Sequence, residues 1–169
     1  MIVSKVEVWK VVVPCKPDTI NSPGIEDSLQ RHDPSLKSFD QGHKWIIRLH
    51  ADSGHAGVGE TGRSEDEAPV QACAKAVLGL SLKNLSFNRL PLPSNDATYA
   101  FEVALLDLMG KILQIPVHQL LGGKVRDLVP VDYWMGRCTT EDTARRAGRA
   151  RESGFHGIKI KCTADDPVY

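Results

Sequence analysis

Two lysines separated by one residue are the side chains in this sequence best suited to chemistry. They lie in Ile158-Lys-Ile-Lys161, a run that alternates apolar and basic residues. Alternate side chains of a β-strand lie on opposite faces, so Lys159 and Lys161 would share one face, about 6–7 Å apart. If that face is buried, lost hydration and the neighbouring like charge both favour the neutral amine, which can remove a proton at physiological pH. The alternative is an edge strand whose lysines are simply solvated.

Strand and helix signals around the two lysines form a βαβ unit. We predict strands over Val129–Met135 and Phe155–Lys161, joined by a helix that runs from a cap at Thr139 to Ser153. Strands connected in this way pair in parallel through a right-handed crossover. In a parallel barrel the covering helices lie on the isoleucine side, so both ammonium groups would lie in the interior. Trp134, near the end of the first strand, is placed to line a pocket there, although core packing explains it nearly as well.

The preceding residues predict a different architecture, an antiparallel meander followed by helices. β-Branched residues, two-residue alternation and turn chemistry indicate three strands, which are expected at Val3–Val13, Lys44–Ala51 and His55–Thr61. Helical spacing of apolar residues indicates two helices, expected over Val70–Leu78 behind a capping box at Ser64–Glu67, and from Ser94 or Asn95 to Ile115. Gly110 inside the second helix predicts a close packing contact. We place the domain boundary near Asp127.

Charge patterns on the predicted helices indicate ion pairs. Asp107 and Lys111 are one turn apart in the longer helix and are expected to pair on its surface. Glu141 and Asp142 come four residues before two arginines of the last helix, Arg145 and Arg146, which indicates a solvated, ion-paired face. No stacking aromatic residues accompany these arginines, so we do not predict a nucleic-acid interface.

Four segments in the expected order resemble enolase-superfamily proteins of the mandelate racemase/muconate lactonizing type. These segments are Gly57-Val-Gly-Glu60, Ala100-Phe-Glu-Val-Ala-Leu-Leu-Asp-Leu-Met-Gly-Lys111, Ile115-Pro-Val-His-Gln-Leu-Leu-Gly-Gly-Lys124 with the following Val125-Arg-Asp-Leu-Val-Pro130, and Gly154-Phe-His-Gly-Ile-Lys-Ile-Lys161. The resemblance implies an α+β capping domain over residues 1–127. Residues 128–169 would then be the first βαβ unit of an α/β TIM-type barrel that is incomplete in this chain.

The resemblance also implies roles for individual residues. Lys161 would abstract the proton alpha to a substrate carboxylate, with Lys159 beside it. A magnesium ion would hold the resulting enediolate, and its acidic ligands are expected on strands beyond Tyr169, so no metal ligand is assigned here. Specificity in this family comes partly from two cap loops, which by position are 14–43 and 52–57. These loops make His32 and His55 candidates for substrate contact, although a solvated loop histidine is the more common explanation of each.

The reaction implied by the resemblance is that of a lyase or an isomerase: dehydration, racemisation or epimerisation, or cycloisomerisation. Analogy with the family slightly favours acid-sugar dehydration. The chain by itself is expected to be inactive, because a barrel of this class takes ~250 residues. The alternatives are a non-catalytic, stand-alone cap that serves as an interaction module, and a small α/β binding protein that only mimics the family pattern.

Composition excludes several other classes of protein. Lysine plus arginine and aspartate plus glutamate number 21 each, so no net field attracts nucleic acid or an anionic membrane. No apolar run approaches the ~20 residues of a membrane-spanning helix. The four cysteines are scattered without a Cys-x-x-Cys pair, which favours a cytoplasmic protein without a zinc ribbon or redox motif. The partners that the family resemblance implies are a small carboxylate substrate and either a second copy or a chain that supplies the rest of the barrel.

Overall fold

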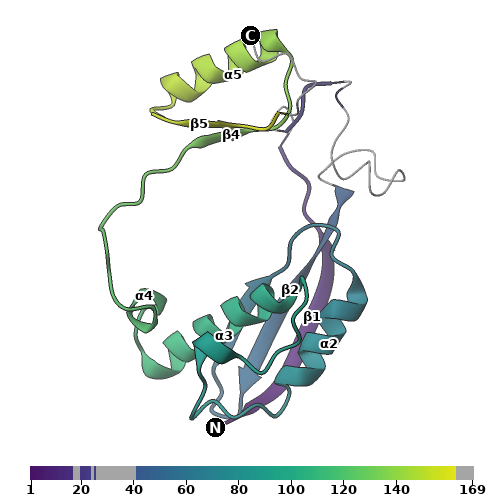
Figure 1. Ribbon diagram of the computed structural model, residues 1–169, viewed down its shortest axis with the longest axis vertical. Coiled ribbons are helices and arrows are strands. Elements are labelled where there is room, and N and C mark those ends of the chain that lie inside the picture. Colours follow the sequence, from purple (N-terminus) through teal and green to yellow (C-terminus); the bar gives the residue numbers. More distant parts are fainter. Residues whose placement is uncertain (17–19, 24, 26–40, 163–169) are drawn as a thin grey trace. The chain divides into compact units, whose positions relative to one another are not determined.

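The computed structural model describes residues 1–16, 20–23, 25 and 41–162 (Figure 1). These residues fall into two compact units. Unit 1 comprises Met1–Val12 and His43–Val125, and unit 2 comprises the described parts of Val13–Gly42 and Arg126–Tyr169. The described residues between the first and second strands, 13–16, 20–23, 25 and 41–42, therefore belong to the same unit as the predicted barrel strands.

Unit 1 is built on a three-stranded antiparallel sheet in the order β1-β2-β3, which confirms the predicted meander. The strands are β1 (Val3–Val12), β2 (His43–Ala51) and β3 (Ala56–Glu60). Alternation in β2 buries Trp45, Ile47, Leu49 and Ala51 on one face, as the sequence pattern requires.

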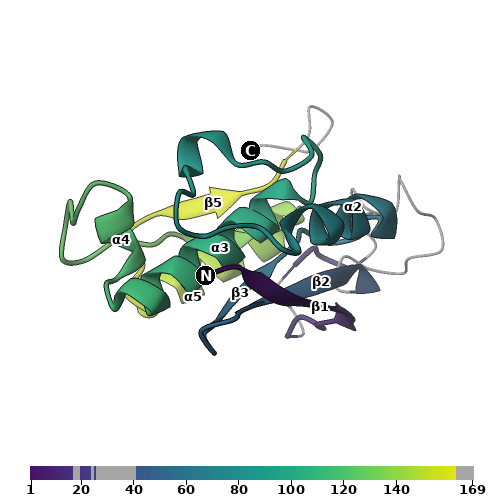
Figure 2. The ribbon, with the colours of Figure 1, turned by 90° about the horizontal axis from the view of Figure 1, so that it is seen from below.

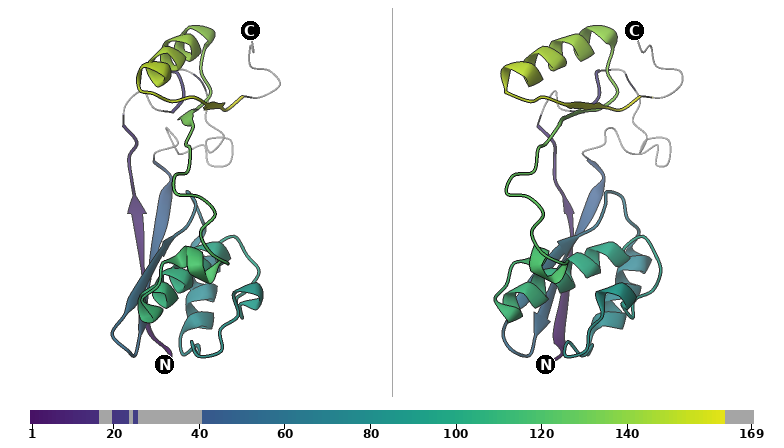
Figure 3. Two further views of the ribbon diagram at one scale, coloured as in Figure 1. Left: turned by 90° about the vertical axis from the view of Figure 1, so that its left-hand side faces the viewer. Right: turned by 60° about the vertical axis from the view of Figure 1, so that its left-hand side comes forward.

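Helices cover the buried face of this sheet (Figures 2 and 3). They are α2 (Glu67–Val77) and α3 (Thr98–Leu113), followed by the single turn α4 (Val117–Leu120), with a short 3-10 helix over Phe87–Arg89 between the two long ones. The apolar stripe of α3, which includes Phe101, Leu105 and Leu108, is fully buried in the core with Ile47 and Leu49. Burial of this stripe, and not helix propensity, supplies most of the stability of such a helix.

Two glycines of β3 allow α3 to lie directly on the strand. A Cβ atom at Gly59 would lie 2.0 Å from the carbonyl oxygen of Ala100, and one at Gly57 would lie 2.2 Å from that of Ala104. Asp107 secures the same contact, because its carboxylate accepts a hydrogen bond from the Val58 amide at 2.8 Å. The predicted pairing of Asp107 with Lys111 is confirmed at 2.7 Å.

The helix boundaries differ from the sequence prediction at their caps. The capping box at Ser64 is wrong: α2 begins at Glu67 after Asp66, which makes no side-chain cap, and Ser64 has a positive φ of 60°. Asn95 does not cap α3 directly, but its side chain accepts a hydrogen bond from the Ala97 amide just before the helix. The close contact predicted at Gly110 is confirmed, since a Cβ atom there would lie 3.0 Å from the Ile115 carbonyl oxygen.

Unit 2 contains the predicted βαβ sequence. Its elements are β4 (Tyr133–Met135), α5 (Thr140–Glu152) and β5 (Ile158–Ile160), and the two strands pair in parallel as expected. The Thr139 hydroxyl caps α5 by accepting a hydrogen bond from the Asp142 amide at 3.3 Å. Both strands are shorter than predicted, because the apolar residues before β4 have no ladder partner among the described residues; Val129 is 72% exposed.

Amide hydrogen exchange should distinguish the two units. We expect strong protection in the Phe101–Leu113 part of α3, whose apolar stripe lies in a closed core, and weak protection over residues 129–161. The exposed apolar residues before β4 and the open strand edges should also promote association at high protein concentration. Equal protection of both regions in a dilute monomer would show that unit 2 is self-sufficient.

Candidate functional site

The two lysines lie on the same face of the parallel pair as Trp134. Register pairs Trp134 with Lys159 and Met135 with Ile160. Residues paired in register lie on the same side of a sheet, and successive residues of a strand lie on opposite sides. Met135 is fully buried while Trp134 is 39% exposed, so Met135 lies on the face that α5 covers and Trp134 on the opposite face (Figure 1). The Lys161 amide donates to the Met135 carbonyl oxygen at 3.2 Å, so the pairing continues one residue past β5. Lys161 therefore follows Lys159 on the face opposite α5.

Both lysine side chains are exposed, which differs from the buried interior expected from the sequence. The physical reason is that α5 covers one face of a two-stranded sheet, while no other described element of unit 2 covers the opposite face. The structure thus gives the two lysines a common face and a neighbouring aromatic ring without desolvating them. Their catalytic roles stay predictions.

The candidate histidines have separate locations. His55 lies in the exposed turn before β3 in unit 1, with Nδ1 3.2 Å from the Ser53 hydroxyl. His32 lies outside the described residues. His43, the last residue of the 14–43 loop as bounded from the sequence, begins β2, and its Nε2 lies 2.8 Å from the Glu65 carbonyl oxygen. The His43 ring therefore contributes to the cap structure.

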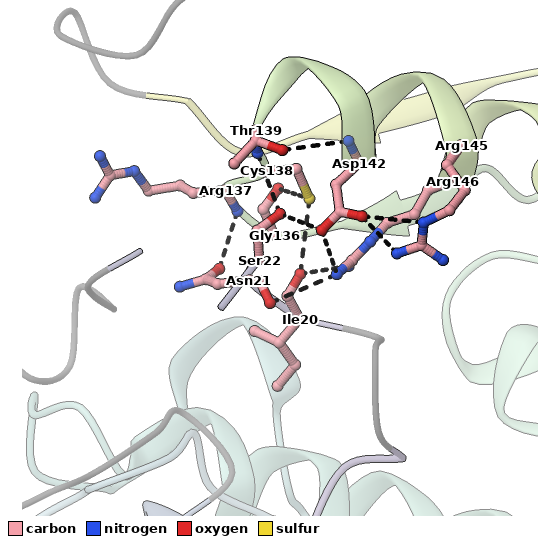
Figure 4. Close-up of polar contacts among 10 residues, drawn as sticks. All are labelled: Ile20, Asn21, Ser22, Gly136, Arg137, Cys138, Thr139, Asp142, Arg145 and Arg146. Atoms are coloured by element: carbon pink, nitrogen blue, oxygen red, sulfur yellow. Dashed lines mark hydrogen bonds and ion pairs between the residues drawn. The ribbon is translucent and has the colours of Figure 1, made fainter. Parts of the chain in front are cut away.

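A cluster that the sequence did not reveal joins the carboxyl end of β4 to residues 20–22 (Figure 4). Asp142 pairs with Arg145, three residues later, at 2.6 Å, whereas Arg146, four residues later and its predicted partner, lies 3.9 Å from the carboxylate. Arg146 does not fit the prediction of a solvated face, because it is 1% exposed and its guanidinium donates to the Ile20 carbonyl oxygen at 2.6 Å. The Ser22 hydroxyl and the Arg145 guanidinium hold the pKa of Asp142 below its usual range.

Comparison with known proteins decides the family. Residues 25–122, more than half of the 169-residue chain, match the family model described as the mandelate racemase / muconate lactonizing enzyme, N-terminal domain. The chain belongs to this family.

Relatives in the mandelate racemase/muconate lactonizing family are enzymes of several kinds. The D-Ala-D/L-Ala epimerase of Cytophaga hutchinsonii is 29% identical over 95% of this chain and 44% of its own length. The L-Ala-D/L-Glu epimerase of Bacillus subtilis is 33% identical over 78% of this chain and 40% of its own length. Other curated relatives are a D-galactonate dehydratase and a chloromuconate cycloisomerase. The chain spans less than half the length of the curated relatives it matches.

Solved structures of family members share the fold. The substrate-liganded L-Ala-D/L-Glu epimerase from Bacillus subtilis superimposes with a TM-score of 0.76 at 25% identity, over 98% of this chain and 46% of that structure. The dipeptide epimerase from Cytophaga hutchinsonii, a complex with Mg and the dipeptide D-Ala-L-Val, gives a TM-score of 0.71 at 25% identity, over 95% of this chain and 44% of that structure.

Magnesium is the metal that family membership implies, but the described residues do not fit it. No three histidine, cysteine, aspartate or glutamate side chains in the described part of the chain lie close enough together to hold a metal ion. Magnesium demands near-octahedral oxygen ligation, usually with carboxylates. Among the described residues of this family member, no cluster of that kind is available to magnesium.

Calorimetric titration of magnesium into the 169-residue chain should show no specific binding, because no set of carboxylates converges in the described residues. The measurement is the heat of binding after the protein has been freed of metal with a chelator. The natural, full-length polypeptide titrated under the same conditions serves as the comparison. Stoichiometric binding with a micromolar dissociation constant in the 169-residue chain would contradict this expectation.

One further property concerns membranes: among the described residues, no helix combines the length and the apolar character needed to span a bilayer.

Proposed function

We propose that this chain supplies the proton-abstracting lysine of an enzyme that acts alpha to the carboxylate of a small-molecule substrate. The observation that carries the proposal is the common face of Lys159 and Lys161 at the carboxyl end of two parallel strands, with Trp134 paired to Lys159. Active sites of (β/α) barrels form at this end of the strands. Family membership supports the same chemistry, because the relatives include epimerases, dehydratases and cycloisomerases.

Each lysine has its own proposed role. The neutral amine of Lys161 takes the alpha proton, so that the C–H bond breaks, the lysine becomes an ammonium, and the electron pair enters the carboxylate as an enediolate. Lys159, on the same face, adds a positive charge that offsets the negative charge that develops on the enediolate. Trp134 would form part of the pocket wall, and His55 and His32 remain candidates for substrate contact from the cap loops.

The enediolate can then react in two ways. Loss of a β-hydroxyl group as water gives dehydration. By analogy with the family, we propose an acid sugar as the substrate of this reaction. Return of a proton to the opposite face gives epimerisation. One observation favours this second candidate: the two epimerases named above match 95% and 78% of the chain, more than the 74% matched by the D-galactonate dehydratase.

We also propose that the natural protein requires magnesium. The support comes from family structures that contain it, such as the complex with Mg and D-Ala-L-Val. When bound, magnesium would supply charge stabilisation of the enediolate oxygens. Its ligands are not among the described residues, so the roles proposed for this chain are those of its own side chains.

Solvent-deuterium exchange at the alpha carbon tests the proposed function. The natural, full-length polypeptide is incubated in D2O with magnesium and a panel of dipeptides and acid sugars. Exchange with inversion identifies an epimerase, whereas release of water with formation of a keto acid identifies a dehydratase. Failure of every carboxylate in the panel to exchange its alpha proton or turn over would contradict the proposal and favour the non-catalytic cap.

A further inference from the structure

Residues 20–22 are held against the carboxyl end of β4 by main-chain hydrogen bonds. The Gly136 amide donates to the Ile20 carbonyl oxygen at 3.2 Å, and the Ser22 amide donates to the Arg137 carbonyl oxygen at 2.9 Å. The Asn21 side chain accepts a third hydrogen bond from the Arg137 amide at 2.9 Å. Three consecutive residues therefore hold two consecutive residues of the strand end.

Two buried side chains lock this contact. The Ser22 hydroxyl, on a residue that is 3% exposed, donates to Asp142 at 2.6 Å and accepts from the Thr139 amide at 3.1 Å. The Arg146 guanidinium donates to the carbonyl oxygens of Ile20 at 2.6 Å and Asn21 at 3.5 Å (Figure 4). Because Ser22 and Arg146 are buried, removal of either side chain would leave its partners with fewer hydrogen bonds in a medium that solvates them poorly.

Gly136 provides an independent sign that the contact is close. A Cβ atom there would lie 2.3 Å from Oδ1 of Asn21 and 2.7 Å from both the carbonyl carbon and the carbonyl oxygen of Ile20. Two of these atoms are backbone and cannot move aside without shifting the segment. A larger residue at position 136 would therefore separate residues 20–22 from the strand end.

The contact reaches Lys161 through a single peptide group. The carbonyl oxygen of Met135 accepts the hydrogen bond from the Lys161 amide, and the amide of Gly136 donates to Ile20. These two groups belong to the same planar peptide unit, whose atoms move together. A segment that fixes the Gly136 amide therefore also fixes the acceptor that holds the Lys161 backbone.

We propose that Ser22 and Arg146 are positioning residues for Lys161, acting through the peptide between Met135 and Gly136. They do not touch the reacting atoms; they set the orientation of the strand end from which the lysine reaches the substrate. The inference rests on the proposed role of Lys161 as the base, and its first test is independent of activity.

The first test is amide hydrogen exchange by NMR in the 169-residue chain. Ser22→Ala should raise the exchange rates of both the Gly136 and the Lys161 amides, by roughly tenfold, as expected for loss of a buried hydrogen-bond partner. Gly136→Ala should do the same at Lys161 by separating the segments sterically. Ser22→Thr, which keeps the hydroxyl, should stay close to wild type, and Ser4→Ala, an exposed serine of unit 1, is the matched control.

The second test measures alpha-proton exchange in the natural, full-length polypeptide. Ser22→Ala should lower kcat by roughly tenfold or more with little change in KM, because misplacement of a catalytic group slows the chemical step. Unchanged exchange of the Lys161 amide, or a uniform rise across all of α5, would overturn the inference, since the contact would then be local or merely structural. If the wild type exchanges no substrate proton, the proposed function fails, while the amide measurement still decides whether the contact reaches Lys161.

Discussion

Replacing Lys161 by alanine is expected to abolish alpha-proton exchange in the natural, full-length polypeptide. Removal of a positioned general base typically costs 10²–10⁴-fold, and no other group on this face is proposed to take the proton. The fold should survive, because the Lys161 side chain is exposed and truncation of an exposed side chain changes stability little. The measurement is deuterium incorporation at the substrate alpha carbon, with the thermal midpoint recorded for the same samples.

Two matched variants sharpen this result. Lys159→Ala should slow exchange without abolishing it, because it removes the neighbouring charge and leaves the base in place. Lys83→Ala removes an exposed lysine of unit 1 and should match the wild type in both rate and thermal midpoint. Exchange at the wild-type rate in Lys161→Ala would show that the lysine pair has a structural role.

Replacing Gly59 by alanine should unfold or strongly destabilise unit 1. The new Cβ atom would lie 2.0 Å from the Ala100 carbonyl oxygen and 3.0 Å from the Ala104 amide nitrogen. Helix α3 would therefore have to move away from β3. Overpacking in a close-packed core typically costs about 1–3 kcal/mol, and a clash with helix backbone should lie at or above the upper end. Chemical denaturation monitored by circular dichroism measures the loss.

Gly148 is the matched control, because a Cβ atom at this position of α5 meets no atom within 4 Å. Gly148→Ala should be neutral or should stabilise the helix by about 0.5–1 kcal/mol, as alanine does in a helix interior. A Gly59→Ala variant as stable as the wild type would mean that the close approach of α3 to β3 is not required.

The sequence predicted the cap sheet well because alternation reports directly on burial. In β2 every second residue is apolar, and the same residues are buried in the structure. The lengths of the strands in unit 2 were overestimated, since apolar residues such as Val131 satisfy the pattern but pair with no strand in the described part of the chain. The helix cap at Ser64 failed for a similar reason: the residue types fit a capping box, but the backbone turns at that serine.

The burial of Arg146 could not be predicted from the local sequence pattern. Its spacing from Asp142 fits an exposed ion pair, and the two groups lie 3.9 Å apart, yet the arginine is buried. What buries it is the contact with Ile20, 126 residues earlier in the chain. Nothing near Arg146 in the sequence reports that contact, although Gly136 at the end of an apolar strand was a signal that a backbone approaches closely there.

The same separation has a consequence for the order in which the protein can form during synthesis. Ser22 leaves the ribosome 120 residues before Asp142. At roughly 5–20 residues per second, this delay is roughly 6–24 s. The last core residue of α3, Leu108, emerges well before Asp142, so the cap can close its core while residues 20–22 still lack their partners. During this interval a nascent chain therefore carries an ordered cap and an Ile20–Ser22 segment that has not yet met its hydrogen-bonding partners. At this stage of synthesis the segment is most exposed to non-native contacts and to chaperones.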